Sequence, residues 1–348
     1  MTRSPSSTSP LHRLALAATA LTVAVVILGA YTRLVDAGLG CPDWPGCYGF
    51  LTVPSSPAEI ATAEERFPHA PVEVHKAWPE VIHRYFAGAL GLVIATLAVV
   101  AWRRRQEGAP LGLALGLLGL VIVQALFGMW TVTLKLWPQV VTAHLLGGFS
   151  TLSLLWLLSL RTSSWSSFWA LPRPPRAPRL LRFALLCVVA LVLQIALGGW
   201  VSSNYAALAC PDFPTCQNQW WPTMNFDRGF NLLQHIGPNY LGGMLDSSAR
   251  VAIHVSHRMG ALVVTALVGT LAVRLLTTAG APRLLRRLGG TVAFLLALQI
   301  GLGIGNVLLQ LPLAVAVAHN AVAAFLLLAL IAVCFCLWPT RPSTQRDH

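Results

Sequence analysis

The chain is poor in charged residues: only 10% of its 348 positions are Asp, Glu, Lys or Arg, whereas 55% are hydrophobic. Its mean hydropathy of +0.66 excludes an ordinary water-soluble domain. A helix needs about 20 apolar residues to cross a hydrocarbon layer of roughly 30 Å, and the apolar runs reach that length. We therefore expect an all-α membrane protein.

Eight apolar runs are long enough to cross a bilayer. We expect transmembrane helices at residues 13–33, 80–102, 111–131, 139–160, 180–202, 249–275, 288–309 and 314–338. The first run is too long for the apolar region of a signal peptide and lacks a convincing cleavage site with small residues. We expect it to stay in the protein as an anchoring helix.

Acidic residues are scarce, and they gather on one side of the predicted membrane. With the N-terminus inside, the inner loops and tails hold 16 of the 24 Lys and Arg residues, and the outer segments hold 10 of the 12 Asp and Glu residues. The positive-inside rule then predicts that both termini lie in the cytoplasm. We expect the membrane to be a bacterial inner membrane. The net charge of +12 reflects this topology and attraction to anionic membrane lipid, and nothing indicates nucleic-acid binding.

A heptapeptide with two cysteines occurs twice, as CPDWPGC at 41–47 and as CPDFPTC at 210–216. On the predicted topology both copies lie in outer loops, where the environment is oxidising. A C-x5-C spacing with internal Pro and Asp suits a stapled turn better than a zinc site, which usually shows C-x2-C pairs or nearby His. We expect the disulfides Cys41–Cys47 and Cys210–Cys216. The residues leave open whether these disulfides are redox-active or only structural.

The repeat extends well beyond the cysteines. In each half the heptapeptide is followed, in the same order, by a His-Arg pair, a Gln and a second His. His83 and His144 are 61 residues apart, and His257 and His319 are 62 apart. Internal self-similarity of this kind indicates a duplicated structural unit.

Each repeat contains four predicted spans, so both copies enter the membrane facing the same way. We therefore expect two tandem, pseudo-symmetric four-helix bundles. Their predicted limits are residues 1–160 and 180–348, joined by a cytoplasmic linker at 161–179 that is rich in Pro, Ser and Arg.

Four of the ten histidines recur at matched places near the outer ends of the even-numbered spans. These are His83, His144, His257 and His319. A lone His on an apolar helix is more often structural, but four matched ones indicate function, because ionisable residues at this depth are costly. Zinc would need further ligands at the same depth and copper would favour nearby Met or Cys, so we expect one haem between two imidazoles in each bundle.

The two halves differ beside the first histidine. Glu80 precedes His83 by three residues, about one helical turn, whereas His254 occupies the equivalent position in the second half. Glu80 suits proton transfer or charge stabilisation at a substrate, or it interacts with the dipole at a helix N-terminus. Arg84 and Arg258 follow the histidines and either pair with haem propionates or extend to lipid headgroups.

The paired loops, the E-x-x-H-R motif at 80–84 and the four histidines resemble those of the haem A synthases over nearly all eight spans. The resemblance implies an oxidoreductase whose substrate is haem O, made by a farnesyltransferase, the haem O synthase. One ring methyl is oxidised by successive hydroxylations to a formyl group, giving haem A for haem-copper oxidases. Neither the electron donor nor the source of oxygen follows from the residues.

The resemblance also implies roles for the matched residues. His83 and His144 would be the ligands at the substrate haem, with Glu80 as the essential carboxylate. His257 and His319 would be the axial ligands of a haem b cofactor in the C-terminal bundle. The two cysteine pairs would form outer disulfides.

Two other classes share the histidine pattern. A diheme electron-transfer protein of cytochrome b type would keep both haems permanently, and a haem carrier or assembly factor would bind haem without oxidising it. Neither class gives Glu80 a necessary task.

Overall fold

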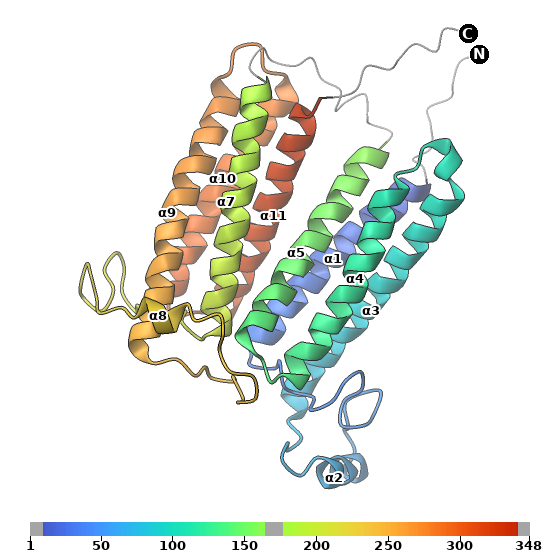
Figure 1. The fold of residues 1–348 in the computed structure, drawn as a ribbon, viewed down its shortest axis with the longest axis vertical. Helices are drawn as coiled ribbons and strands as arrows, with labels where there is room; N and C mark the ends of the chain where they lie inside the picture. Colours follow the sequence, from blue (N-terminus) through green and yellow to red (C-terminus); the bar gives the residue numbers. More distant parts are fainter. Residues whose placement is uncertain (1–9, 164–176, 340–348) are drawn as a thin grey trace.

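The computed structural model describes residues 10–163 and 177–339, which are almost entirely helical (Figure 1). This described part contains ten α-helices and no β-strand. Eight are long and apolar: α1 (Pro10–Leu34), α3 (Val74–Arg103), α4 (Leu111–Thr133), α5 (Pro138–Thr162), α7 (Ala177–Ser203), α9 (Ser247–Thr277), α10 (Arg283–Leu308) and α11 (Leu313–Leu337). Two short helices, α2 (Pro57–Arg66) and α8 (Phe226–Gly229), lie in the outer loops. The prediction of an all-α protein with eight spans is confirmed.

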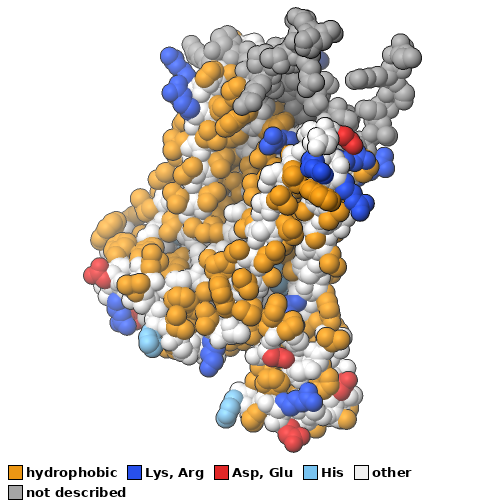
Figure 2. Space-filling view, turned by 45° about the vertical axis from the view of Figure 1, so that its right-hand side comes forward, with side chains coloured by type: hydrophobic (Ala, Val, Ile, Leu, Met, Phe, Trp, Pro, Cys, Tyr) orange, Lys and Arg blue, Asp and Glu red, His pale blue; other side chains and the backbone are white. Residues whose placement is uncertain are grey.

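Several helices extend beyond the predicted apolar runs. Helix α3 begins at Val74 rather than at residue 80, and α10 begins at Arg283 rather than at residue 288. Hydropathy marks only the part of a helix inside the hydrocarbon layer, and polar residues continue the same helix beyond it. Figure 2 shows this division, with hydrophobic side chains covering most of the helical surface and charged side chains gathered near its two ends. Most of the predicted linker, residues 164–176, lies outside the described residues.

The long helices contact one another in the same order in both halves. Helices α1, α3, α4 and α5 pack as one set, and α7, α9, α10 and α11 pack as a second set beside it (Figure 1). The sets meet where α5 packs against α7 and α11, and where α1 packs against α11. Each set thus contains four long helices in contact along the chain order, and their description as two pseudo-symmetric bundles stays a prediction.

Two polar contacts between the halves join equivalent positions of the repeat. The Arg33 guanidinium donates to the carbonyl oxygen of Ser202, and the Tyr205 hydroxyl donates to Asp36 Oδ1 over 2.9 Å. In both pairs the partners are 169 residues apart, which is also the offset between Cys41 and Cys210. Only residues on a two-fold axis meet their own counterparts, so these contacts lie where a pseudo-two-fold axis would pass.

Within the long helices of the first half, tight packing is concentrated toward the ends that lie away from the outer loops. In the first half, fully buried apolar residues from α1, α3, α4 and α5 form one cluster there, which includes Leu11, Ile94 and Leu158. Toward the outer loops, residues 23–30 of α1 and 141–148 of α5 all keep accessible surface. Eight consecutive helical residues cover every side of a helix. The outer part of the first half is therefore packed less tightly than the inner part.

A glycine at the junction between the halves gives a first test. A Cβ on Gly199 of α7 would lie 2.8 Å from Leu145 Cδ2 and 3.3 Å from Thr142 Cγ2 of α5. We expect Gly199→Val to lower the free energy of unfolding by about 1–3 kcal/mol, because extra methyl groups overpack this contact. Thermal denaturation in detergent measures the effect. Gly116→Val, at a position with nothing within 4 Å, is the control; equal melting temperatures would contradict the tight junction.

Candidate functional site

The four matched histidines lie on α3, α5, α9 and α11, two in each half. Within each half the two histidines belong to one packed helix set, His83 and His144 to the first and His257 and His319 to the second. All four side chains keep some accessible surface although they lie within the helix sets. The structure therefore places each predicted histidine pair within one helix set, and their joint binding of a ligand stays a prediction.

Each histidine ring lies against a glycine of a neighbouring helix. A Cβ built on the glycine would come within 3.0–3.5 Å of ring atom Cε1 in every case. The four pairs are Gly29 with His83, Gly128 with His144, Gly198 with His257, and Gly303 with His319. At Gly29, Gly198 and Gly303 a Cβ would crowd the ring at 3.0–3.2 Å, whereas at Gly128 it would only touch the ring at 3.5 Å. The first three glycines therefore keep space beside the imidazoles.

Sequence reasoning missed these glycines, although the repeat contains a signal for them. Gly29 and Gly198 each precede the first cysteine of their half by 12 residues, and Gly128 and Gly303 each precede the second histidine by 16. Glycine is common in transmembrane helices, so no single one stands out. Only alignment of the two halves distinguishes them.

Three rings present a buried nitrogen that has no partner. Nδ1 of His83, His144 and His319 is shielded from solvent, and no described residue hydrogen-bonds to it. Buried polar atoms are nearly always paired in folded proteins, so such orphaned atoms indicate a ligand. Two imidazoles on different helices, each with a glycine beside it, suit a flat macrocycle held through its iron. The residues present therefore fit a haem in each half.

Glutamine side chains support the rings of the second half. Gln194 Nε2 lies 3.1 Å from His257 Nδ1 and donates to the carbonyl oxygen of His257 over 2.9 Å. Gln299 Nε2 lies 3.1 Å from His319 Nε2. In the first half Val25 takes the place of Gln194, and Gln124, the counterpart of Gln299, lies against Gly147. The rings of the second half thus have side-chain partners that orient them, whereas among the described residues no side-chain hydrogen bond holds His83 or His144.

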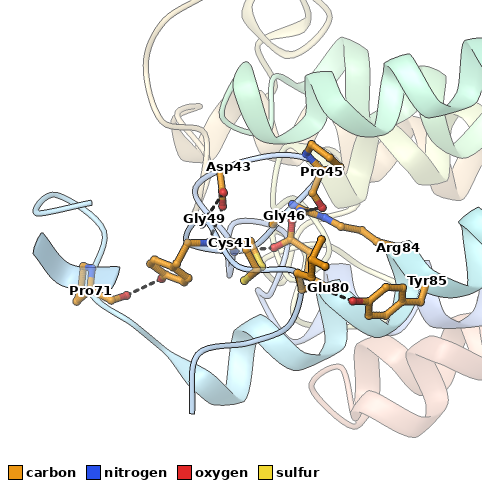
Figure 3. Close-up of a disulfide and its surroundings, with 12 residues drawn as sticks. Cys41, Asp43, Pro45, Gly46, Gly49, Pro71, Glu80, Arg84 and Tyr85 are labelled. Carbon is orange, nitrogen blue, oxygen red and sulfur yellow. Dashed lines mark hydrogen bonds and ion pairs between the residues drawn. A yellow bond between two sulfur atoms is a disulfide. The ribbon is translucent and has the colours of Figure 1, made fainter. Parts of the chain in front are cut away.

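The Glu80 carboxylate is buried, with 5% of the residue exposed, and has a partner on each oxygen (Figure 3). Oε1 lies 2.6 Å from Arg84 Nη2, and Oε2 accepts the backbone N–H of Cys41 over 3.0 Å. Glu80 therefore does not cap the N-terminus of α3, which begins six residues earlier at Val74. Its partners are a cation one turn along the helix and the stapled loop.

The second half replaces this ion pair with neutral contacts. His254 stands at the position of Glu80 and is buried, with Nδ1 2.9 Å from the carbonyl oxygen of Ala206. Arg258 donates to the carbonyl oxygens of Cys210, Asp212 and Thr215 over 2.7–3.0 Å. No acidic side chain contacts either residue in the part of the chain that the structure describes.

Both predicted disulfides form, and their loops have the same construction. Cys41–Cys47 and Cys210–Cys216 have Cα–Cα distances of 4.8 and 4.5 Å. In the first loop the Asp43 carboxylate accepts the N–H groups of the two residues after the second cysteine. Asp212 does the same in the second loop, and its pKa is held below the ordinary value, first by the Thr215 hydroxyl and also by the two N–H groups.

The two arginines next to the histidines contact these loops. Arg84 Nη1 donates to the carbonyl oxygens of Gly46 and Pro45 over 2.5 and 3.2 Å, and Arg258 binds the second loop as described above. Contacts of either arginine with propionates or headgroups stay a prediction. Backbone carbonyls as the acceptors were not foreseen, because a carbonyl carries no signature in the sequence.

Comparison with known proteins agrees with this geometry. Residues 12–331, which reach from α1 into α11, match the COX15-CtaA family, described as cytochrome oxidase assembly protein. Relatives named heme A synthase include one from Shewanella oneidensis, 45% identical over 93% of this chain and 96% of its own length. Others come from Rhizorhabdus wittichii, 29% identical over 89% of each chain, and Caulobacter vibrioides, 28% identical over 88% of this chain and 90% of its own. The chain therefore belongs to the COX15-CtaA family of cytochrome oxidase assembly proteins.

Proposed function

We propose that this chain is a haem A synthase, an oxidoreductase that converts a ring methyl of haem O to a formyl group. Membership of the family and the name of the Shewanella oneidensis relative support this function. One structural observation carries it further: a buried carboxylate, Glu80, lies one helical turn from His83, while His254 takes its place beside His257. The two otherwise matched sites thus differ in the one group suited to chemistry on a substrate.

The proposal assigns one haem to each half. Residues 1–160 would form the substrate bundle, in which His83 and His144 bind haem O. Residues 180–348 would form the cofactor bundle, in which His257 and His319 bind haem b. The glutamines beside the second pair suit a resident cofactor, whereas the less supported first pair suits a molecule that must enter and leave. When bound, haem b supplies one-electron transfer.

The chemistry at the first site requires a base or an anion. Conversion of a methyl to a formyl group takes up one oxygen atom from water or dioxygen, and with water it releases four protons and four electrons. Glu80 is the buried anionic group nearest in sequence to the first histidine pair, and both of its oxygens are held in place. It would accept protons from the methyl carbon or stabilise positive charge that develops there.

The proposed function also implies a membrane location and a set of partners. Eight long apolar helices indicate a membrane protein, and the distribution of Lys and Arg favours cytoplasmic termini. The bacterial relatives suit a bacterial inner membrane. Both sites would then lie near the outer surface. Expected partners are the haem O synthase that supplies the substrate, the assembly of a haem-copper oxidase that takes the product, and an electron donor.

Product analysis separates this function from its rivals. The chain is co-expressed with a haem O-producing farnesyltransferase in a host that lacks haem A, and the extracted haems are identified by chromatography and mass. We expect the formyl haem or its hydroxymethyl precursor only when the chain is present. Haem O alone, in folded and haem-loaded protein, would instead indicate a diheme electron-transfer protein or a haem carrier.

The carboxylate is tested by substitution at equivalent positions of the two halves. We expect Glu80→Gln to lower haem A formation by about 10²-fold or more, because the amide neither accepts a proton nor carries charge. His254→Gln, the matched control, should keep turnover within tenfold of the unchanged protein. Bound haem b, measured by its absorbance, should be unchanged in Glu80→Gln. Normal turnover in Glu80→Gln would remove Glu80 from the mechanism.

The glycines beside the rings predict a binding effect. A Cβ on Gly198 would lie 3.2 Å from His257 Cε1, and a larger side chain would push the ring out of position. We expect Gly198→Leu to weaken haem b binding about tenfold or more, equal to about 1.4 kcal/mol. Spectroscopic titration of the purified protein with haem measures this. Gly301→Leu on α10, at a position with nothing within 4 Å, should bind normally; equal affinities would refute the spacing role.

A further inference from the structure

Arg84 connects the Glu80 carboxylate of α3 to the stapled loop through one guanidinium group. Nη2 binds Glu80 on the same helix, and Nη1 donates to the carbonyl oxygens of Gly46 and Pro45 in the stapled loop (Figure 3). The Arg84 side chain is 16% exposed and that of Glu80 is 7% exposed, so water competes little with this ion pair. The planar fork of the guanidinium fixes both directions at once.

The loop also reaches the carboxylate directly, through the N–H of Cys41, and this requires a close approach of two backbones. A Cβ on Gly40 would lie 2.8 Å from the backbone nitrogen of Ala77 and closer still to the carbonyl group of Lys76. These atoms belong to the backbone of α3 and cannot rotate away. Gly40 therefore lets the loop lie against the first turn of α3, where the Cys41 N–H meets Glu80 Oε2.

The second half shows that the loop can be held without a carboxylate. Arg258 binds its loop through three carbonyl oxygens. The position of Gly40 is taken by Ala209, and that of Glu80 by His254. Glycine and carboxylate thus occur together in the first half and are replaced together in the second. The Arg84–Glu80 ion pair and the close approach of the loop to α3 at Gly40 therefore hold the Glu80 carboxylate, and the loop fold itself does not require them.

We propose that Arg84 and Gly40 are positioning residues, which lock the Glu80 carboxylate to the Cys41–Cys47 loop so that carboxylate and loop move as one unit. A loop displaced from α3 would carry away the Cys41 N–H and release one oxygen of the carboxylate. Loss of the Arg84 guanidinium would release the other oxygen and remove two of the hydrogen bonds between the loop and α3. The consequence for catalysis rests on the proposed function, whereas the mechanical link does not.

The two disulfides make the link measurable within one molecule. The full-length protein in detergent is treated with a water-soluble phosphine, and the reduction rate of each disulfide is followed by alkylation and peptide mass spectrometry. We expect Arg84→Gln and Gly40→Ala to speed reduction of Cys41–Cys47 several-fold and to leave Cys210–Cys216 unchanged. Arg258→Gln should speed reduction of Cys210–Cys216 and leave Cys41–Cys47 unchanged. Gly91→Ala, at a position of α3 with nothing within 4 Å, should change neither rate.

Turnover provides the second measurement. Arg84→Gln and Gly40→Ala should lower the turnover number while haem O binding is retained, and Arg84→Lys should restore part of it because a cation remains beside Glu80. Normal monodispersity and haem b content identify folded variants; if Arg84→Gln fails this check, Arg84→Lys and Gly40→Ala decide. Unchanged reduction of Cys41–Cys47 in the folded variants would overturn the proposal. If the unsubstituted protein forms no haem A, the proposed function fails, yet the reduction rates still decide on the link.

Discussion

A carboxylate at the edge of a hydrocarbon layer needs partners, and Glu80 has two: the Arg84 guanidinium and the Cys41 N–H. Without them the charged form would be strongly disfavoured at this depth. One of these two partners, the Cys41 N–H, depends in turn on the structure of the outer loop. The N–H is available only because the loop is stapled, capped by Asp43 and able to approach α3 at Gly40. The staple and the Asp cap recur in the second loop without a carboxylate at the position of Glu80, so the close approach at Gly40 is the feature of the first loop that is specific to Glu80.

The repeat separates scaffold from function. Positions that agree between the halves are those that build the helix sets, the stapled loops, the histidine pairs and the glycines beside them. Three positions that differ lie close to the matched sites: Glu80 against His254, Gly40 against Ala209, and Val25 against Gln194. The first half acquires a carboxylate with a close loop, and the second half acquires a polar support for an imidazole. A common fold thereby holds one site suited to reaction and one suited to a resident group.

The sequence predicts the fold well because the bilayer leaves few alternatives. Apolar runs must be helices there, since unpaired backbone groups are not tolerated in hydrocarbon, and a repeated pattern of His, Gln and Cys reveals the duplication. The sequence predicts poorly whatever depends on contacts between distant segments. The glycines beside the rings were missed because their partners lie on other helices. The loop acceptors of Arg84 were missed because they are backbone carbonyls, whose positions depend on the folded loop.

The contacts on the pseudo-two-fold axis bear on why the two halves belong to one chain. In a symmetric dimer of identical halves, a residue on the axis faces an identical residue, so Arg would face Arg and Asp would face Asp, with like charges in contact. Here Arg33 faces Ser202 and lies over the ring of Tyr205, which in turn faces Asp36. Such complementary pairs can form on the axis only if the two halves have different sequences. In a symmetric dimer the residues on the axis cannot be chosen independently of each other. Fusion into one polypeptide removes this restriction, so the contact between the two halves can be built from complementary residues.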